Sequence, residues 1–275
     1  MTTALRPLST GELLDRTFSL YRSHFGLFIG IFALPHLVVL AFQCVGVALQ
    51  TSGNQIANLF ITFVWGLGAL FLTVIVSAAS QAATVVAVSD VHLDRPSSVK
   101  DSFIRIKGHI LGVIGVSMLV GLGVGAGLIA LIVPGVLLAL MWSIAVPVKV
   151  LEDKGATEAM SRSSDLTKGD RGRIFVIWLL FIVLSIGISL LIQMPVEWAA
   201  GVSSRGALAR SAGGWQVASL AAAFISQCLV GPLVTIGFSL VYYDERVRKE
   251  AFDLQLMMTT IDAATVPGSP AQVGA

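Results

Sequence analysis

Long apolar segments that carry almost no charge restrict what this sequence can fold into. Residues 174–196, for example, contain no Asp, Glu, Lys or Arg. About 20 apolar residues are enough for a helix to cross the roughly 30 Å of hydrocarbon in a bilayer. Over the whole chain 55% of residues are hydrophobic and 12% are charged, which is about half the charged share of a soluble domain. The sequence therefore predicts an all-α, multi-pass integral membrane protein.

Six transmembrane spans are expected, and two of them share one apolar stretch. Residues 109–151 would form a single helix of about 65 Å, roughly twice the membrane thickness. Pro134 and Gly135 interrupt this stretch, because proline cannot continue a helical ladder and Pro-Gly favours a turn. We expect a hairpin there; a re-entrant pair that does not fully cross is the alternative. The expected spans are residues 25–49, 57–88, 109–133, 135–151, 174–196 and 215–243.

The positions of the basic residues test this topology independently. With six spans, 16 of the 18 Lys and Arg residues lie on the side that holds both termini. Arg205 and Arg210 lie on the other side. Because loops rich in Lys and Arg stay in the cytoplasm, both termini are expected there. We assign residues 1–253 to a single membrane domain and residues 254–275 to a largely disordered cytoplasmic tail.

Three charged segments each precede a pair of spans. In each segment an acidic residue stands four positions before an arginine, the favourable order for an ion pair on a helix. The pairs are Glu12 and Arg16, Asp101 and Arg105, and Glu158 and Arg162. We interpret the pattern as a three-fold repeat of one unit, in which an amphipathic helix is followed by a span out and a span back. We call the three amphipathic helices the collar.

Three roles are open for the collar. Its helices are expected to lie at the cytoplasmic interface, where an apolar stripe of Leu14, Phe18 and Tyr21 enters the acyl boundary and the arginines meet anionic headgroups. Alternatively, the charged residues bind one another across the repeats and form a ring beneath the bundle. In the third interpretation the helices are solvated loops that only set the topology.

The sequence contains no recognisable catalytic or metal-binding motif. Its four histidines are scattered and lack the spacing of paired metal ligands. The glycines at 121, 123, 125 and 127 resemble a phosphate-binding loop, but they lie within an expected span. They are better explained as small-residue faces for close helix packing. We expect no enzyme activity, no metal, no cofactor and no nucleic-acid partner.

Uncharged polar residues at membrane depth form a second group of candidates. They are His36, Gln43, Ser77, Gln81 and Gln227. One interpretation is interhelical hydrogen bonding, which is common in membrane bundles. The other is a polar cavity that opens to the cytoplasm or to a lipid. No acidic or basic residue lies deep in any expected span, which argues against an ion-coupled pump.

Three segments carry a resemblance to a known family. They are LRPLSTGELLDRTFSLYRSHF at residues 5–25, VKVLEDKGATEAMSRSSDLTKGDRGR at 148–173 and VYYDERVRKEAFDLQL at 241–256. They resemble the membrane domain attached to some bacterial glycerophosphoryl diester phosphodiesterases. The resemblance implies a six-helix fold in a bacterial inner (plasma) membrane. The catalytic barrel that follows this domain in fused relatives has no counterpart in this sequence, so the resemblance does not extend to hydrolysis.

The function expected first is a non-enzymatic membrane scaffold or accessory module for lipid-related machinery. The collar would carry this function by binding anionic lipid headgroups and a membrane or cytoplasmic protein partner. The alternative is a carrier or binder of lipids or small amphiphiles, which would use the intramembrane polar residues. An intramembrane lipid enzyme is the third option.

Overall fold

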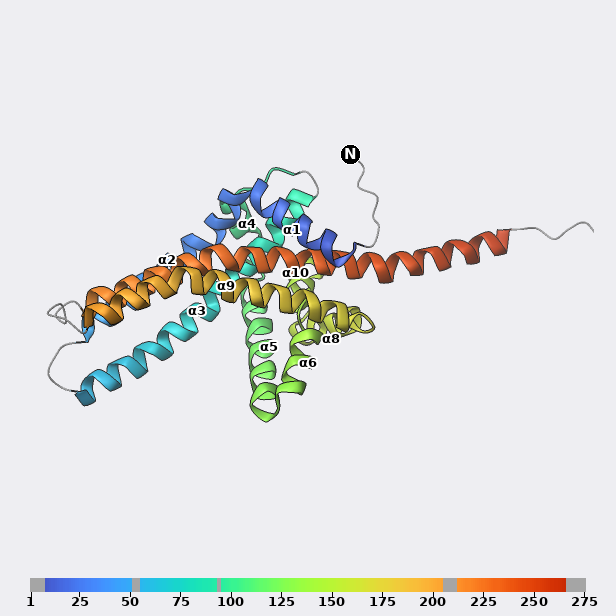
Figure 1. Ribbon diagram of the computed structural model, residues 1–275. Coiled ribbons are helices and arrows are strands. Elements are labelled where there is room, and N and C mark those ends of the chain that lie inside the picture. The colour runs from blue at the N-terminus through green and yellow to red at the C-terminus, as the bar shows by residue number, and fades with distance from the viewer. Residues whose placement is uncertain (1–7, 51–54, 93–94, 205–211, 266–275) are drawn as a thin grey trace, which may run out of the picture.

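The protein is an all-α helical bundle with the dimensions of a six-span membrane protein. The computed structural model describes residues 8–50, 55–92, 95–204 and 212–265, and within these ranges it contains helices and no strands (Figure 1). Six segments of this described part are long and apolar enough to cross a membrane. They are α2 (Phe25–Leu49), α3 (Gln55–His92), α5 (Ile110–Ala130), α6 (Ile132–Met141) continued by α7 (Ala145–Glu152), α9 (Arg171–Ser204) and α10 (Ala212–Thr265).

Three shorter helices form the collar, and each precedes two of the spanning segments. They are α1 (Thr10–Ser23), α4 (Val99–Ile106) and α8 (Ala156–Thr167). Equivalent positions of the three helices are buried in the same phase. In each helix the residue directly after the acid of the acid–arginine pair is fully buried. These residues are Leu13, Ser102 and Ala159. The position four residues further on, occupied by Thr17, Ile106 and Ser163, is buried as well. The element order and the burial pattern together support the three-fold repeat.

Contacts between the repeats follow a cyclic order. The return helices of the three units are α3, α7 and α10. Each collar helix packs against the return helix of the unit before it, so that α4 contacts α3 and α8 contacts α7. The collar helix of the first unit, α1, contacts the return helix of the last unit, α10 (Figure 1). The collar is therefore a closed ring of three equivalent junctions.

The hydrophobic core lies beside the collar. Leu13, Val88, Val148 and Tyr242 are all fully buried and belong to one cluster. Near the opposite ends of the spans, large apolar side chains are open, and Leu191, for example, is 77% exposed. Exposed apolar surface on this scale is incompatible with water and suited to lipid. The protein is an integral membrane protein.

The hairpin expected within residues 109–151 exists, but its break is not where the sequence predicts it. The chain leaves helical geometry at Leu131, which has φ −163° and ψ 144°. Pro134 lies in the first turn of α6, where the amide hydrogen it lacks would have no helical partner. Gly127 and Gly135 allow the two helices to pack closely. A Cβ on Gly127 would lie only 2.9 Å from the Gly135 Cα. The turn prediction at Pro134 and Gly135 is therefore wrong by three residues.

The last helix also differs from the prediction. Residues 254–265 were assigned to a disordered tail, but α10 continues through them to Thr265. Its 54 residues correspond to a length of about 80 Å, and its C-terminal part extends away from the bundle (Figure 1). No helix-breaking residue occurs after the last span until Pro267, and the residue before a proline is disfavoured in a helix. Residues 266–275 lie outside the described part of the chain.

Candidate functional site

The acidic residues of the collar cap their own helices. Glu12 accepts a hydrogen bond from the Ser9 backbone amide at 2.8 Å, and Glu158 accepts one from the Gly155 amide at 3.2 Å. Asp101 accepts a hydrogen bond from the Ser98 hydroxyl at 2.6 Å. Amides at a helix start have no helical acceptor, so Glu12 and Glu158 satisfy donors that would otherwise be unpaired. In α4 the Ser98 Oγ accepts from the Asp101 amide, and the Asp101 carboxylate accepts from that hydroxyl.

Two collar arginines bind acids on other helices. Arg105 Nη1 lies 2.6 Å from Asp90 Oδ1, at the end of α3. Arg162 Nε lies 3.3 Å from Glu152 Oε2, at the end of α7, and its Nη2 also pairs with Glu250. Each arginine thus reaches the return helix of the preceding unit. Both pairs cross between repeat units, but they join each arginine to an acid outside the collar and not to another collar residue, and they take the place of the ion pairs within α4 and α8 that the spacing predicts.

The third junction closes the ring between the first and last units. Asp244 on α10, 4% exposed, accepts a hydrogen bond from the Leu8 amide at 2.6 Å. Arg173 on α9 and Arg248 on α10 pair with the same carboxylate at 2.5 and 2.8 Å, and both also donate to the Leu8 carbonyl. Arg173 additionally pairs with the fully buried Glu245 at 3.2 Å. Arg16, the α1 counterpart of Arg105 and Arg162, is half-buried.

A smaller ion-pair group closes the base of the second unit. His109 Nε2 lies 3.1 Å from Asp153 Oδ1, and Lys149 Nζ lies 3.4 Å from the same oxygen. The hydrogen bond from His109, followed by that from Lys149, lowers the pKa of Asp153. These contacts join the start of α5 to the end of α7.

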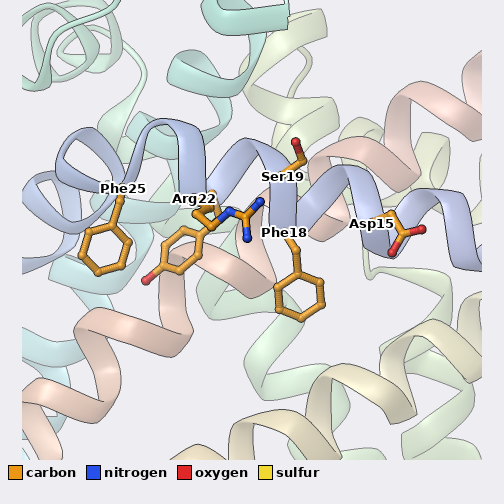
Figure 2. Close-up of a pocket in the computed structure, with 6 residues that line it drawn as sticks. Asp15, Phe18, Ser19, Arg22 and Phe25 are labelled. Carbon is orange, nitrogen blue, oxygen red and sulfur yellow. The ribbon is translucent and has the colours of Figure 1, made fainter.

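The apolar stripe predicted for α1 is divided between the core and the surface. Leu14 packs against the core, and Tyr21 Oη donates a hydrogen bond to the Leu229 carbonyl at 3.0 Å. Burial raises the pKa of Tyr21 to about 12. Phe18 of α1 and Phe25, the first residue of α2, are 44% and 47% exposed (Figure 2). With Tyr21 they line a hollow of about 470 Å³.

The predicted polar residues within the spans do not share one cavity. His36 is buried and bonded, with Nδ1 2.8 Å from the Phe32 carbonyl oxygen and Nε2 3.4 Å from Ser77 Oγ. Because a carbonyl only accepts, Nδ1 carries the hydrogen and Nε2 can accept from the Ser77 hydroxyl. The contact with Ser77 is an interhelical hydrogen bond, as one of the two interpretations expects, whereas the contact with Phe32 lies within α2.

Four of these polar residues line two separate hollows. His36, Gln43 and Gln227 line a small hollow of about 180 Å³. Gln81 lines a larger hollow of about 690 Å³, and Gln227 borders this one as well. The expectation of a single cavity formed by all these residues is therefore wrong, because Gln43 and Gln81 face different spaces.

The larger hollow is lined mainly by residues of the α5–α6 hairpin, of α7 and of α10, with Trp178 of α9. We call it the hairpin hollow. Its walls carry apolar side chains with a few polar groups, and the described residues that line it include no Asp, Glu, Lys, Arg or His. The Oγ atom of Ser117, in this lining, is buried and has no hydrogen-bond partner among the described residues.

The glycines of α5 have two different roles. Gly123 faces the Trp142 ring, and Gly127 approaches the Gly135 backbone, as expected for a packing face. Gly121 and Gly125 line the hairpin hollow, and a Cβ added at either would have no atom within 4 Å. The packing interpretation therefore holds for one glycine pair, while the other pair leaves space open.

A family model described as a domain of unknown function, DUF8558, matches residues 109–253. The chain belongs to this family. The DUF8558 match begins after α4, covers the two spans of the second unit and the third unit as far as residue 253 in α10, and includes most of the residues that line the hairpin hollow. None of the curated proteins and no solved structure matches the chain significantly.

Within the DUF8558 region and the first unit, sequence reasoning missed the partners of the collar arginines. These partners include Asp90 and Glu152, and the acids that pair with Arg173 of α9, Asp244 and Glu245, were missed as well. A signal for them exists in the sequence, since each acid follows directly on an apolar span that is otherwise free of acids near that end. Among the described residues, no three His, Cys, Asp or Glu side chains gather as they would around a metal ion.

Proposed function

We propose that this protein is a non-enzymatic membrane binder of a lipid or lipid-like amphiphile, which it holds in the hairpin hollow. The observation that carries the proposal is an uncharged hollow of about 690 Å³ between spanning helices. Small-molecule sites commonly measure about 300–1,000 Å³ and are mostly apolar with a few polar groups. The lining matches that description, because Gln81, Gln227 and Ser117 stand among tryptophan, phenylalanine and valine side chains.

The collar supports this proposal over a scaffold function. A scaffold that captures anionic lipids or acidic protein partners would need collar arginines whose charge is not already paired with an acid. Arg105 and Arg162 are instead engaged by acids of neighbouring units. A scaffold for lipid-related machinery is the second candidate, and the part of α10 that extends from the bundle favours it (Figure 1).

The proposal places the collar on the cytoplasmic side of a bacterial plasma membrane. The distribution of Lys and Arg supports this orientation. The link to lipids also draws on the resemblance to the membrane domain of glycerophosphoryl diester phosphodiesterases. Acid–base chemistry on a bound lipid would need an ionisable group at the site, so an uncharged lining supports binding rather than catalysis.

Filling one wall of the hairpin hollow is expected to remove the bound amphiphile. Leucines in Gly121→Leu/Gly125→Leu would project into open space, so the fold is expected to remain intact. Native mass spectrometry after release from gentle detergent should show a discrete bound mass on the wild type. Its occupancy should fall by about tenfold or more in the variant, which corresponds to about 1.4 kcal/mol of binding free energy.

The matched control is Gly115→Leu/Gly187→Leu. These two glycines also have no atom within 4 Å of an added Cβ, and neither is part of the hollow's lining. The control should keep the bound mass. A wild type without any discrete bound mass, or a filled variant that retains it fully, would refute the proposed function.

A further inference from the structure

We infer that the hairpin hollow selects an amphiphile with an uncharged, hydrogen-bonding headgroup, such as a diacylglycerol, over one with an anionic phosphate. This inference rests on the proposed function and names the chemical class of its ligand. It follows from three properties of the lining, which are its lack of charge, an unpaired hydroxyl and the nature of its apolar wall.

The hollow offers no counter-charge to an anionic headgroup. No basic side chain is among the described residues of its lining. Lys149 follows the lining residues Val146 and Pro147 on α7, but its ammonium pairs with Asp153. A phosphate placed in the hollow would lose its hydration without gaining a cation, which is far more costly than burying a neutral polar group.

The polar groups of the hollow suit a hydroxyl or an ester. The side-chain amides of Gln81 and Gln227 each provide two donors and an acceptor. Ser117 also lines the hollow, and its hydroxyl, enclosed by protein atoms and without a partner among the described residues, would gain one by turning toward a ligand oxygen. A hydroxylated glycerol ester could donate to one of these groups and accept from another, with no net charge to compensate.

The remaining wall suits hydrocarbon. Trp142 and Trp178 line the hollow together with Phe32 and Phe238. The exposed apolar surface of the neighbouring spans would place the hollow in contact with lipid chains. An amphiphile could therefore enter from the bilayer and keep part of its acyl chains in the membrane.

The test compares two probes that differ only in the phosphate. The full-length protein is reconstituted into phosphatidylcholine vesicles that contain a minor fraction of either diacylglycerol or phosphatidic acid with identical acyl chains. After gentle release, native mass spectrometry measures how much of each probe stays bound. We expect diacylglycerol to be retained with a preference of about tenfold or more, and Ser117→Ala to reduce its retention several-fold.

The control for Ser117→Ala is Ser185→Ala, which removes a hydroxyl that bonds the Phe181 carbonyl of its own helix away from the hollow. It should leave retention unchanged. Equal retention of phosphatidic acid, or no effect of Ser117→Ala, would overturn the headgroup inference while leaving an amphiphile site in place. If neither probe is retained above the level of Gly121→Leu/Gly125→Leu, the proposed function itself fails.

Discussion

Replacing Arg173 with methionine is expected to lower the free energy of unfolding by about 3–5 kcal/mol. Arg173 pairs with Asp244 and Glu245, whose side chains are 1% and 0% exposed. Removing the guanidinium leaves buried carboxylates with less positive charge nearby, and Glu245 already has one oxygen without a partner in the described part of the chain. The measurement is thermal or denaturant unfolding in detergent, followed by circular dichroism.

Two further variants separate this effect from a general loss of an arginine. Arg246→Met removes a similar ion pair on α10, but its side chain and that of Glu250 are 46% and 38% exposed. Exposed pairs contribute roughly 0–1 kcal/mol, so this control should be mild. Arg173→Met/Glu245→Gln removes a buried charge together with its partner and should recover part of the loss. If Arg173→Met is as mild as Arg246→Met, the third junction does not stabilise the ring.

Replacing Gly135 with valine is expected to destabilise the α5–α6 hairpin by about 1–3 kcal/mol, the usual cost of overpacking. A Cβ on Gly135 would lie 2.5 Å from the Leu128 backbone nitrogen. A backbone atom cannot move aside as a side-chain tip can, so the two helices must separate. The unfolding midpoint in detergent should fall clearly below that of the wild type.

Gly115→Val is the appropriate comparison for this prediction. Gly115 lies in α5 of the same hairpin, and a Cβ added there would have no atom within 4 Å. Both variants add the same β-branched side chain to a helix, so their intrinsic helix preferences are matched. Equal midpoints for the two variants would mean that the close approach at Gly135 does not exist in solution.

The spans could be predicted well because the membrane imposes one strong condition on them. The bounds predicted for the first span, 25–49, agree with those of α2. His24 and Gln50 flank a largely apolar run there that contains no Asp, Glu, Lys or Arg. Helix ends without such a change in polarity were predicted less well. The turn before α6 lies inside an apolar segment, and both Leu131 and Pro134 could break the helix there. The close contact between Gly127 and Gly135, on either side of Leu131, distinguishes a break at Leu131 from one at Pro134.

The candidate site was less predictable because its partners are distant in sequence. Spacing by four residues predicts that Asp101 binds Arg105, but the carboxylate accepts from the hydroxyl of Ser98, which caps the helix, and the arginine pairs with Asp90. Local patterns cannot show this competition, since it depends on where the return helix of another unit ends. The polar residues within the spans were identified, yet their division between two hollows depends on how far the α5–α6 hairpin separates from its neighbours.

The closed ring also sets an order for biosynthesis. A chain is made from its N-terminus, so α1 emerges first, yet two of its anchors are Leu229 and Asp244, which are 208 and 236 residues from their partners Tyr21 and Leu8. These two anchors become available to the first helix only when the last of the six spans, α10, has been made. The two internal junctions can form as each unit is completed. Assembly of the ring thus ends at α1, the first of its helices to be made.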